Sequence, residues 1–191
     1  MTDTPRHDDT SDDPTGDAGA GGGPAGDHTR LATYLRDHDA LVTSASALAE
    51  RAVRQNIGTP YETPLRTILE DIGHDHVALR SVMAVSGVEP SPVRTTASRL
   101  GELVGRLKFN GSFRGYSPSS RVLEIEGLAM LTQGRLGLWQ SIASVYGPTA
   151  LPDDVDVDGL QARGTDQLER LRALHVEAAG EAFADASPAV G

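Results

Sequence analysis

The sequence predicts an all-α protein built around one four-helix bundle. Long stretches carry apolar residues at alternating steps of three and four, a spacing that places them on one face of a helix. Ser-Pro and Thr-Pro pairs stand where these stretches begin, and glycines stand where they end. No stretch of comparable length alternates apolar and polar residues as a β-strand would. The length of 191 residues fits a single domain.

Residues 1–27 differ from the rest of the chain in composition. They contain seven Asp against one Arg, six Gly and three Pro, and Met1 is their only large apolar residue. Such a segment cannot bury enough apolar surface to offset its chain entropy. We therefore expect a disordered acidic tail over residues 1–27 and a helical bundle domain over residues 28–186. The tail either docks on a partner or keeps the protein soluble, and its composition favours the second interpretation.

Charge and cysteine content exclude several classes of protein. The net charge of −10 opposes binding to a phosphate backbone, so we expect no nucleic-acid partner. Without cysteine, the chain has no disulfide, thiolate metal site or thiol nucleophile. No apolar run approaches the roughly 20 residues that span a bilayer, and the N-terminus lacks the features of a signal peptide. These observations predict a cytoplasmic protein with no membrane partner.

The first predicted hairpin consists of helices over residues 28–55 and 63–86. Thr63-Pro64 provides an N-cap followed by proline at the first helical position, whereas Thr59 and Glu62 offer a competing capping box. Gly58 and Gly87 follow the two helices, where left-handed C-caps are expected. We call the stripe of residues that each helix should turn toward the bundle core its seam. The predicted seams of these two helices comprise Leu31, Leu35, His38, Val42, Ala45, Ala49 and Ala52, then Leu65, Ile68, Ile72, Asp75, Leu79 and Val82.

Three more helices are predicted over residues 92–108, 118–146 and 156–184. Ser91-Pro92 and Ser117-Pro118 mark the first two starts, and the acidic turn that ends at Asp158 marks the third. Trp139 is expected in the core, because it lies on an apolar seam. The seams comprise Val93, Ala97, Leu100, Val104 and Leu107; Val122, Ile125, Ala129, Leu136, Trp139 and Ala143; and Leu160, Gly164, Gln167, Leu171, Leu174 and Ala178.

Connection lengths predict the topology. Short connections join helices 28–55 and 63–86 and also helices 118–146 and 156–184, so each pair should form an antiparallel hairpin. The hairpins are separated by a much longer stretch that contains the short helix 92–108. Two antiparallel hairpins joined by a long crossover define the ferritin-like arrangement of a four-helix bundle. A five-helix bundle without this crossover is the alternative.

Four segments between Leu31 and Phe183 support the same fold by resemblance. They read YLRDHDAL, GVEPSPVR, GRLKFNGSFRGYSPSSRVLEIEGL and DQLERLRALHVEAA. On these segments the chain resembles a set of largely uncharacterised actinobacterial ferritin-like four-helix-bundle proteins. The segments contain no catalytic motif, so the resemblance implies a fold and no particular activity.

A ferritin-like bundle that binds two metal ions needs Glu-x-x-His on two helices and a Glu on each of the others. This chain has no Glu-x-x-His. The nearest match runs from Asp71 to His74, and both ends are predicted to point away from the core. A standard di-iron site is therefore not expected.

Polar residues nevertheless fall on the seams in two layers. Antiparallel packing should bring residues at similar distances from a hairpin turn close together. Such layers usually pair buried polar groups and fix helix register. Alternatively they hold iron, manganese or zinc, although each layer has few strong ligands. The layers contain His38, Asp75, His76 and Gln167, with Gln133 nearby, and Glu126 and His175, with Glu124 and Glu50 nearby.

The stretch that ends the crossover forms a second candidate site. Lys108, Phe109, Phe113, Arg114 and Tyr116 combine rings and cations on a glycine-containing loop of an acidic protein. Such loops often contact partners. Alternatively the aromatic rings anchor the crossover against the end of the bundle, which is the commoner fate of aromatic residues.

Two functional hypotheses follow. The first is a non-enzymatic bundle without a cofactor that acts through protein interaction or assembly, with a protein partner or as a homo-oligomer. The second is a metal-binding protein with a redox or storage role that uses iron, manganese or zinc. The incomplete carboxylate set favours the first hypothesis.

Overall fold

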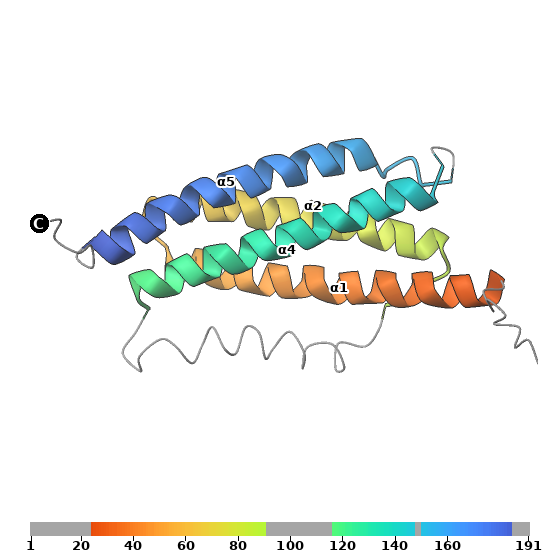
Figure 1. The fold of residues 1–191 in the computed structure, drawn as a ribbon, viewed down its shortest axis with the longest axis horizontal. Coiled ribbons are helices and arrows are strands. Elements are labelled where there is room, and N and C mark those ends of the chain that lie inside the picture. The colour runs from red at the N-terminus through yellow and green to blue at the C-terminus, as the bar shows by residue number, and fades with distance from the viewer. Residues whose placement is uncertain (1–23, 91–115, 148–149, 185–191) are drawn as a thin grey trace, which may run out of the picture.

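The computed structural model describes residues 24–90, 116–147 and 150–184, and this part of the chain consists of helices joined by turns, with no strand (Figure 1). Its helices are α1 (Pro24–Gln55), α2 (Glu62–Val85), α4 (Pro118–Val145) and α5 (Val157–Phe183). The prediction of an all-α fold with four long helices is confirmed. Helix α1 begins at Pro24, within the segment predicted as a tail. Residues 1–23 of that tail and the predicted helix over residues 92–108 lie outside the described residues.

The four helices pack as two hairpins laid against each other. Helix α1 packs on α2, α4 packs on α5, and the hairpins meet through α1 with α4 and α2 with α5. Figure 1 shows that the helices of each hairpin run in opposite directions, whereas α2 and α4 run in the same direction. Helix α2 therefore ends at the opposite end of the bundle from the start of α4.

Capping side chains and glycines, which are recognisable in the sequence, define the helix ends. Ser117 caps α4, because its hydroxyl accepts a hydrogen bond from the backbone nitrogen of Ser120 at 3.2 Å. Asp156 caps α5 in the same way through Gly159 at 3.0 Å, as expected for the acidic turn. Gly58 and Gly87 adopt positive φ angles of 77° and 65°, the left-handed conformation that glycine accommodates without strain.

The start of α2 differs from the prediction based on Thr63-Pro64. The helix begins at Glu62, and its carboxylate accepts a hydrogen bond from the backbone nitrogen of Gly58 at 2.8 Å. This bond resembles the reach-back of a capping box but extends one residue further toward the turn than Thr59. Tyr61 occupies the N-cap position without a side-chain capping bond, so neither predicted cap is present and the helix starts one residue before the predicted position.

Most of the predicted seam residues of the four helices lie in the core, but Ala143 is exposed, and Leu31, Ala129 and Leu174 are only partly buried. Fully buried side chains include Leu35 of α1, Ile72 of α2 and Leu171 of α5. Trp139 is 1% exposed, so its predicted place in the core is confirmed. Gly164 allows the close approach of α4 and α5, because a Cβ atom there would lie 2.8 Å from Cδ2 of Leu136.

Candidate functional site

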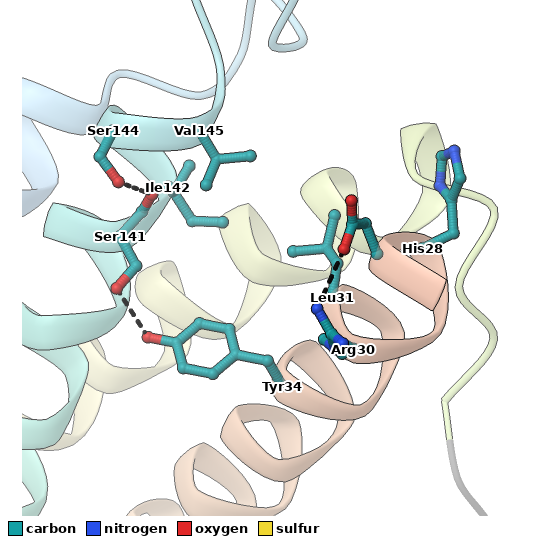
Figure 2. Close-up of a pocket in the computed structure, with 9 residues that line it drawn as sticks. His28, Arg30, Leu31, Tyr34, Ser141, Ile142, Ser144 and Val145 are labelled. Atoms are coloured by element: carbon teal, nitrogen blue, oxygen red, sulfur yellow. Dashed lines mark hydrogen bonds and ion pairs between the residues drawn. The ribbon is translucent and has the colours of Figure 1, made fainter. Parts of the chain in front are cut away.

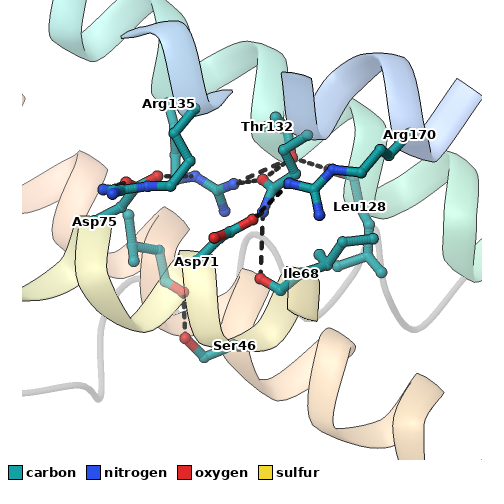
Figure 3. Close-up of polar contacts among 11 residues, drawn as sticks. Ser46, Ile68, Asp71, Asp75, Leu128, Thr132, Arg135 and Arg170 are labelled. Atoms are coloured by element: carbon teal, nitrogen blue, oxygen red, sulfur yellow. Dashed lines mark hydrogen bonds and ion pairs between the residues drawn. The ribbon is translucent and has the colours of Figure 1, made fainter. Parts of the chain in front are cut away.

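A buried polar network crosses the middle of the bundle (Figure 3). Asp75 of α2, Arg135 of α4 and Gln167 of α5 are 2%, 3% and 0% exposed. A buried polar group left without a partner costs about 1–3 kcal/mol, and a charged group costs more. The partners of these three side chains therefore determine what the network can do.

Asp75 is held between two arginines. Its Oδ1 accepts a hydrogen bond from Nη2 of Arg163 at 2.9 Å, and its Oδ2 lies 3.1 Å from Nε of Arg135 in an ion pair. Burial raises the pKa of Asp75, and the two guanidinium groups oppose that shift. Burial lowers the pKa of Arg135, and Asp75 opposes that shift in turn. The carboxylate is thus neutralised by cations of its own chain.

Gln167 joins three helices beside this ion pair. Its Oε1 accepts hydrogen bonds from the hydroxyl of Thr132 at 3.0 Å and, in a short contact, from Nη2 of Arg135. Its Nε2 donates to the backbone oxygen of Ile68 at 3.2 Å. The amide therefore connects α5 to both α4 and α2, and both of its ends are engaged.

The prediction that Asp71 points away from the core is wrong. Its carboxylate lies at the junction of α2 and α5, 15% exposed, where Nη2 of Arg170 binds Oδ2 at 2.8 Å. Arg170 reaches across from α5 and binds Asp166 of its own helix as well, at 2.9 Å. A long arginine from the facing helix thus allows a carboxylate next to the seam to turn inward. His74, at the other end of the same motif, is exposed as predicted.

His38 is buried on α1. Its ring meets the ring of Tyr34 edge-on at a centroid distance of 4.5 Å, and its Nδ1 has no hydrogen-bond partner in the described part of the chain. Burial lowers the pKa of His38, and the charge of Asp37 opposes the shift. Asp75 pairs with arginines and not with His38, although both were predicted in one layer. His38 contacts Tyr34 instead.

His76 is bonded to a carboxylate that the sequence analysis did not select. Its Nε2 lies 2.9 Å from Oδ1 of Asp39, a residue of α1 that is 6% exposed. Arg80 donates to Oδ2 of the same carboxylate at 3.0 Å. His76 is therefore part of a connection between α1 and α2 that is separate from Asp75.

The second predicted layer contains one pair. Nε2 of His175 lies 2.8 Å from Oε1 of Glu126, which confirms that these residues face each other on α4 and α5. The two side chains are 34% and 47% exposed, so the pair lies on the surface. Of the suggested neighbours, Glu124 binds Arg51 of α1 at 2.9 Å and Glu50 faces Arg54 of its own helix at 3.5 Å.

Tyr116 belongs to a cluster at the end of the bundle near the first hairpin turn. Its hydroxyl accepts a hydrogen bond from Nδ2 of Asn56 and donates one to Oε2 of Glu124, both at 2.9 Å. Asn56 is fully buried and also accepts from Nε of Arg121 at 2.7 Å. Burial raises the pKa of Tyr116 to about 12 and raises that of Glu124 as well. Tyr116 thus anchors the chain to the bundle.

The other residues of the predicted interaction loop, Lys108, Phe109, Phe113 and Arg114, lie outside the described residues. The anchoring of Tyr116 agrees with the interpretation of the loop's aromatic rings as anchors, at this one position.

A largely apolar groove of about 660 Å³ opens at the opposite end of the bundle (Figure 2). It lies between the first turns of α1 and the last turns of α4, with Leu31, Ile142 and Val145 on its walls. The hydroxyl of Tyr34 donates to Oγ of Ser141 at 3.0 Å and closes the groove on its inner side. Its polar lining residues include Asp27, His28 and Ser144.

The described side chains fit a metal ion poorly. Among these residues, no group of three or more His, Asp and Glu side chains could hold one. The candidate ligands occur as the pairs His76 with Asp39 and His175 with Glu126, and Asp75 is occupied by two arginines. A divalent cation beside Asp75 would lie close to two guanidinium charges.

Sequence analysis missed Arg135 and Asn56, although both stand at seam spacing. Arg135 lies seven residues from Leu128 and from Ile142, and Asn56 continues the series of Ala49 and Ala52. A polar residue at a seam position is a usable signal, because it must find a buried partner. The sequence could have identified these residues, but not their partners.

The described part of the chain is thus a four-helix bundle with a charge-paired interior. No protein-family model, curated protein or solved structure matches the chain. None of the described helices is long and apolar enough to cross a membrane.

Proposed function

We propose that this chain is a ferritin-like bundle that acts through protein interaction or assembly, as a partner-binding protein or a homo-oligomer without a metal cofactor. The observation that carries the proposal is the position of Asp75 between Arg135 and Arg163. In a metal-dependent bundle, the interior presents carboxylates and imidazoles to cations. Here the buried carboxylate of Asp75 is paired with two guanidinium groups instead.

The directions of the helices support the ferritin-like part of the proposal. Helices α2 and α4 run in the same direction, so residues 86–117 connect opposite ends of the bundle. A connection of this kind between two antiparallel hairpins distinguishes ferritin-like bundles from up-down-up-down bundles. The resemblance of the sequence segments to actinobacterial ferritin-like proteins points the same way.

The contact surface that we propose is the loop from Lys108 to Tyr116. It combines rings and cations, and arginine and aromatic residues are enriched in protein interfaces. Tyr116 fixes one end of the loop to Asn56 and Glu124, so the loop emerges from a rigid support. A loop attached in this way loses less entropy on binding than a free chain would.

Sedimentation velocity over a concentration series tests this function. We expect the full chain to self-associate, and we expect Phe113→Ser to weaken that association while the helical circular dichroism stays unchanged. Val176→Ser, a change at a 71% exposed residue of α5, is the control and should leave association intact. If the chain stays monomeric and binds nothing through this loop in a crosslinking experiment, the proposal fails.

The alternative is a metal-binding protein with a redox or storage role, and the surface pair of Glu126 and His175 is the observation in its favour. Two ligands are fewer than iron, manganese or zinc sites usually have. Loss of bound metal in Glu126→Gln would support this alternative.

A further inference from the structure

The turn between α1 and α2 presents a large apolar side chain to solvent. Ile57 is 66% exposed, and among the exposed large apolar side chains of the described residues it alone lies outside a helix. The turn itself, residues 56–61, contains no charged residue. We call this turn with its isoleucine the Ile57 tip.

The Ile57 tip has a fixed shape. On one side of Ile57, the side chain of Asn56 is buried and donates to the backbone oxygen of Ala52 at 2.8 Å. On the other side, Gly58 adopts a φ angle of 77°, and its backbone nitrogen donates to Oε2 of Glu62 at 2.8 Å. A side chain presented by a preorganised turn loses little entropy when it is bound. Ile57 is therefore suited to anchor a contact with a concave apolar surface.

The groove between α1 and α4 is a concave surface of this kind (Figure 2). The hydroxyl groups that line it already donate within the chain: Tyr34 to Oγ of Ser141 at 3.0 Å, and Ser141 and Ser144 to backbone oxygens at 2.9 and 2.7 Å. Asp27 and Arg30, both exposed, pair with each other at 3.2 Å. An uncharged apolar side chain therefore fits the groove better than a polar ligand, which would have to lose hydrogen bonds to water there.

The Ile57 tip matches the groove in charge better than the exposed apolar residues on the sides of helices do. Val77 of α2 and Val176 of α5 are exposed to a similar degree, but Arg80 and Arg172 stand within one turn of them on the same helices. Docking either helix side would bring a charged side chain to an apolar wall. Docking the Ile57 tip buries no charge of the turn.

A chain cannot place its own Ile57 tip in its own groove. Figure 1 shows that the turn between α1 and α2 and the first turns of α1 lie at opposite ends of the bundle. Helix α1 has 32 residues, which corresponds to about 48 Å between these ends. The occupant therefore comes from another molecule. Tyr116, the last residue of the proposed contact loop, is bonded to Asn56 of the tip, so both features lie at one end of the bundle.

We propose that the Ile57 tip of one copy of the chain docks in the groove of the next copy, so that the chains associate head to tail. This inference rests on the proposed function and specifies the partner as a second copy. Because the two surfaces differ, the contact is heterologous and either continues into an open series or closes into a ring. One turn in one groove buries less than a standard interface of about 1,200–2,000 Å², so the association is weak and depends on concentration.

Sedimentation velocity of the full chain with one substitution on each surface tests the inference. Ile57→Asp places a charge on the tip. Val145→Lys places a charge on the groove wall, at a residue that is 62% exposed and at a helix end where a cation is favourable, so the bundle should fold. Each substitution should weaken self-association roughly tenfold or more. Val77→Asp, at a residue that is also 66% exposed but lies on the side of α2, is the matched control and should leave association unchanged.

An equimolar mixture of the two variants distinguishes this contact from a symmetric one. The Ile57→Asp chain keeps an intact groove, and the Val145→Lys chain keeps an intact tip. The mixture should therefore form one-to-one dimers and nothing larger, at a concentration where each variant by itself is monomeric.

Three results would overturn the inference. If the unmodified chain is monomeric at all concentrations, there is no head-to-tail contact, and the proposed function then depends on a crosslinked partner. If the chain associates and Val145→Lys associates equally well, the groove is not involved, and the loop of the proposed function remains the contact surface. If both variants are monomeric and their mixture is monomeric too, the contact is symmetric and the tip does not enter the groove.

Discussion

Replacing Asp75 with Asn tests the interior network most sharply, because it removes one charge and almost no volume. Asp75 and Arg135 have side chains that are each 3% exposed, so solvent cannot replace the lost carboxylate. Arg163 also loses its ionic partner, but its side chain is 32% exposed and can turn toward water. The cost therefore falls mainly on Arg135, whose guanidinium stays buried and keeps only the more distant carboxylate of Asp71 as an opposite charge.

Removing one partner of a buried ion pair destabilises a protein by about 3–5 kcal/mol. Exposed ion pairs contribute about 0–1 kcal/mol, which is the range we expect for Glu126→Gln at the surface pair with His175. The structure thus predicts that two substitutions of the same chemical kind differ severalfold in effect. Burial separates them, and so does the partner, because arginine is always charged whereas histidine is charged only when protonated; both pairs have short contact distances.

Urea unfolding followed by circular dichroism at pH 7 measures both free energies of unfolding. The transition midpoint of Asp75→Asn should fall far below that of the unmodified chain with little change in the slope. The reasoning is refuted if Asp75→Asn loses less than about 1 kcal/mol, because a buried arginine that has lost the carboxylate in contact with it costs more than that.

Four further substitutions have defined outcomes. His38→Gln should flatten the pH dependence of stability, because burial lowers the pKa of His38 from 6.5. The stability that the neutral ring contributes is complete above pH 6.5 and is lost as the pH falls. Urea midpoints of both proteins at pH 7.5 and 5.5 measure this difference. Asn56→Ala should lower the free energy of unfolding by about 1–3 kcal/mol, because its partly buried partners Tyr116 and Arg121 lose their hydrogen bonds, and an unchanged urea midpoint would contradict this. Gly164→Ala should destabilise by about 1–3 kcal/mol, because the new Cβ meets Leu136, whereas Gly180→Ala in the same helix meets nothing and should stabilise by about 0.5–1 kcal/mol; equal thermal shifts for the two would refute the packing argument.

Local patterns in the sequence predicted most of the helical framework. The Ser117-Pro118 pair and Asp156 each act through an atom of their own side chain on a backbone group three residues away, so sequence spacing suffices. Gly58 and Gly87 likewise predict left-handed turns, because the backbone conformation depends on the glycine itself. The start of α2 was less certain, because Thr59, Glu62 and Thr63 offer competing caps within one turn.

The interior network was harder to predict, because its partners come from different helices. Equal distances from a hairpin turn correctly placed Glu126 opposite His175. The same rule failed to identify the partners of Asp75, which come from α4 and α5 rather than from α1. Arginine has a long side chain, so its contact can lie a full turn away from its Cα atom, and helix spacing alone does not specify that reach.

Elemental analysis of the full chain, purified without chelator or affinity metal, tests the central claim most directly. If the arginines around Asp75 replace a metal centre, iron, manganese and zinc should all be far below one ion per chain, also after anaerobic addition of iron. Retention of about one or more of these ions per chain would contradict the account. The two His–carboxylate pairs would then be the first residues to replace.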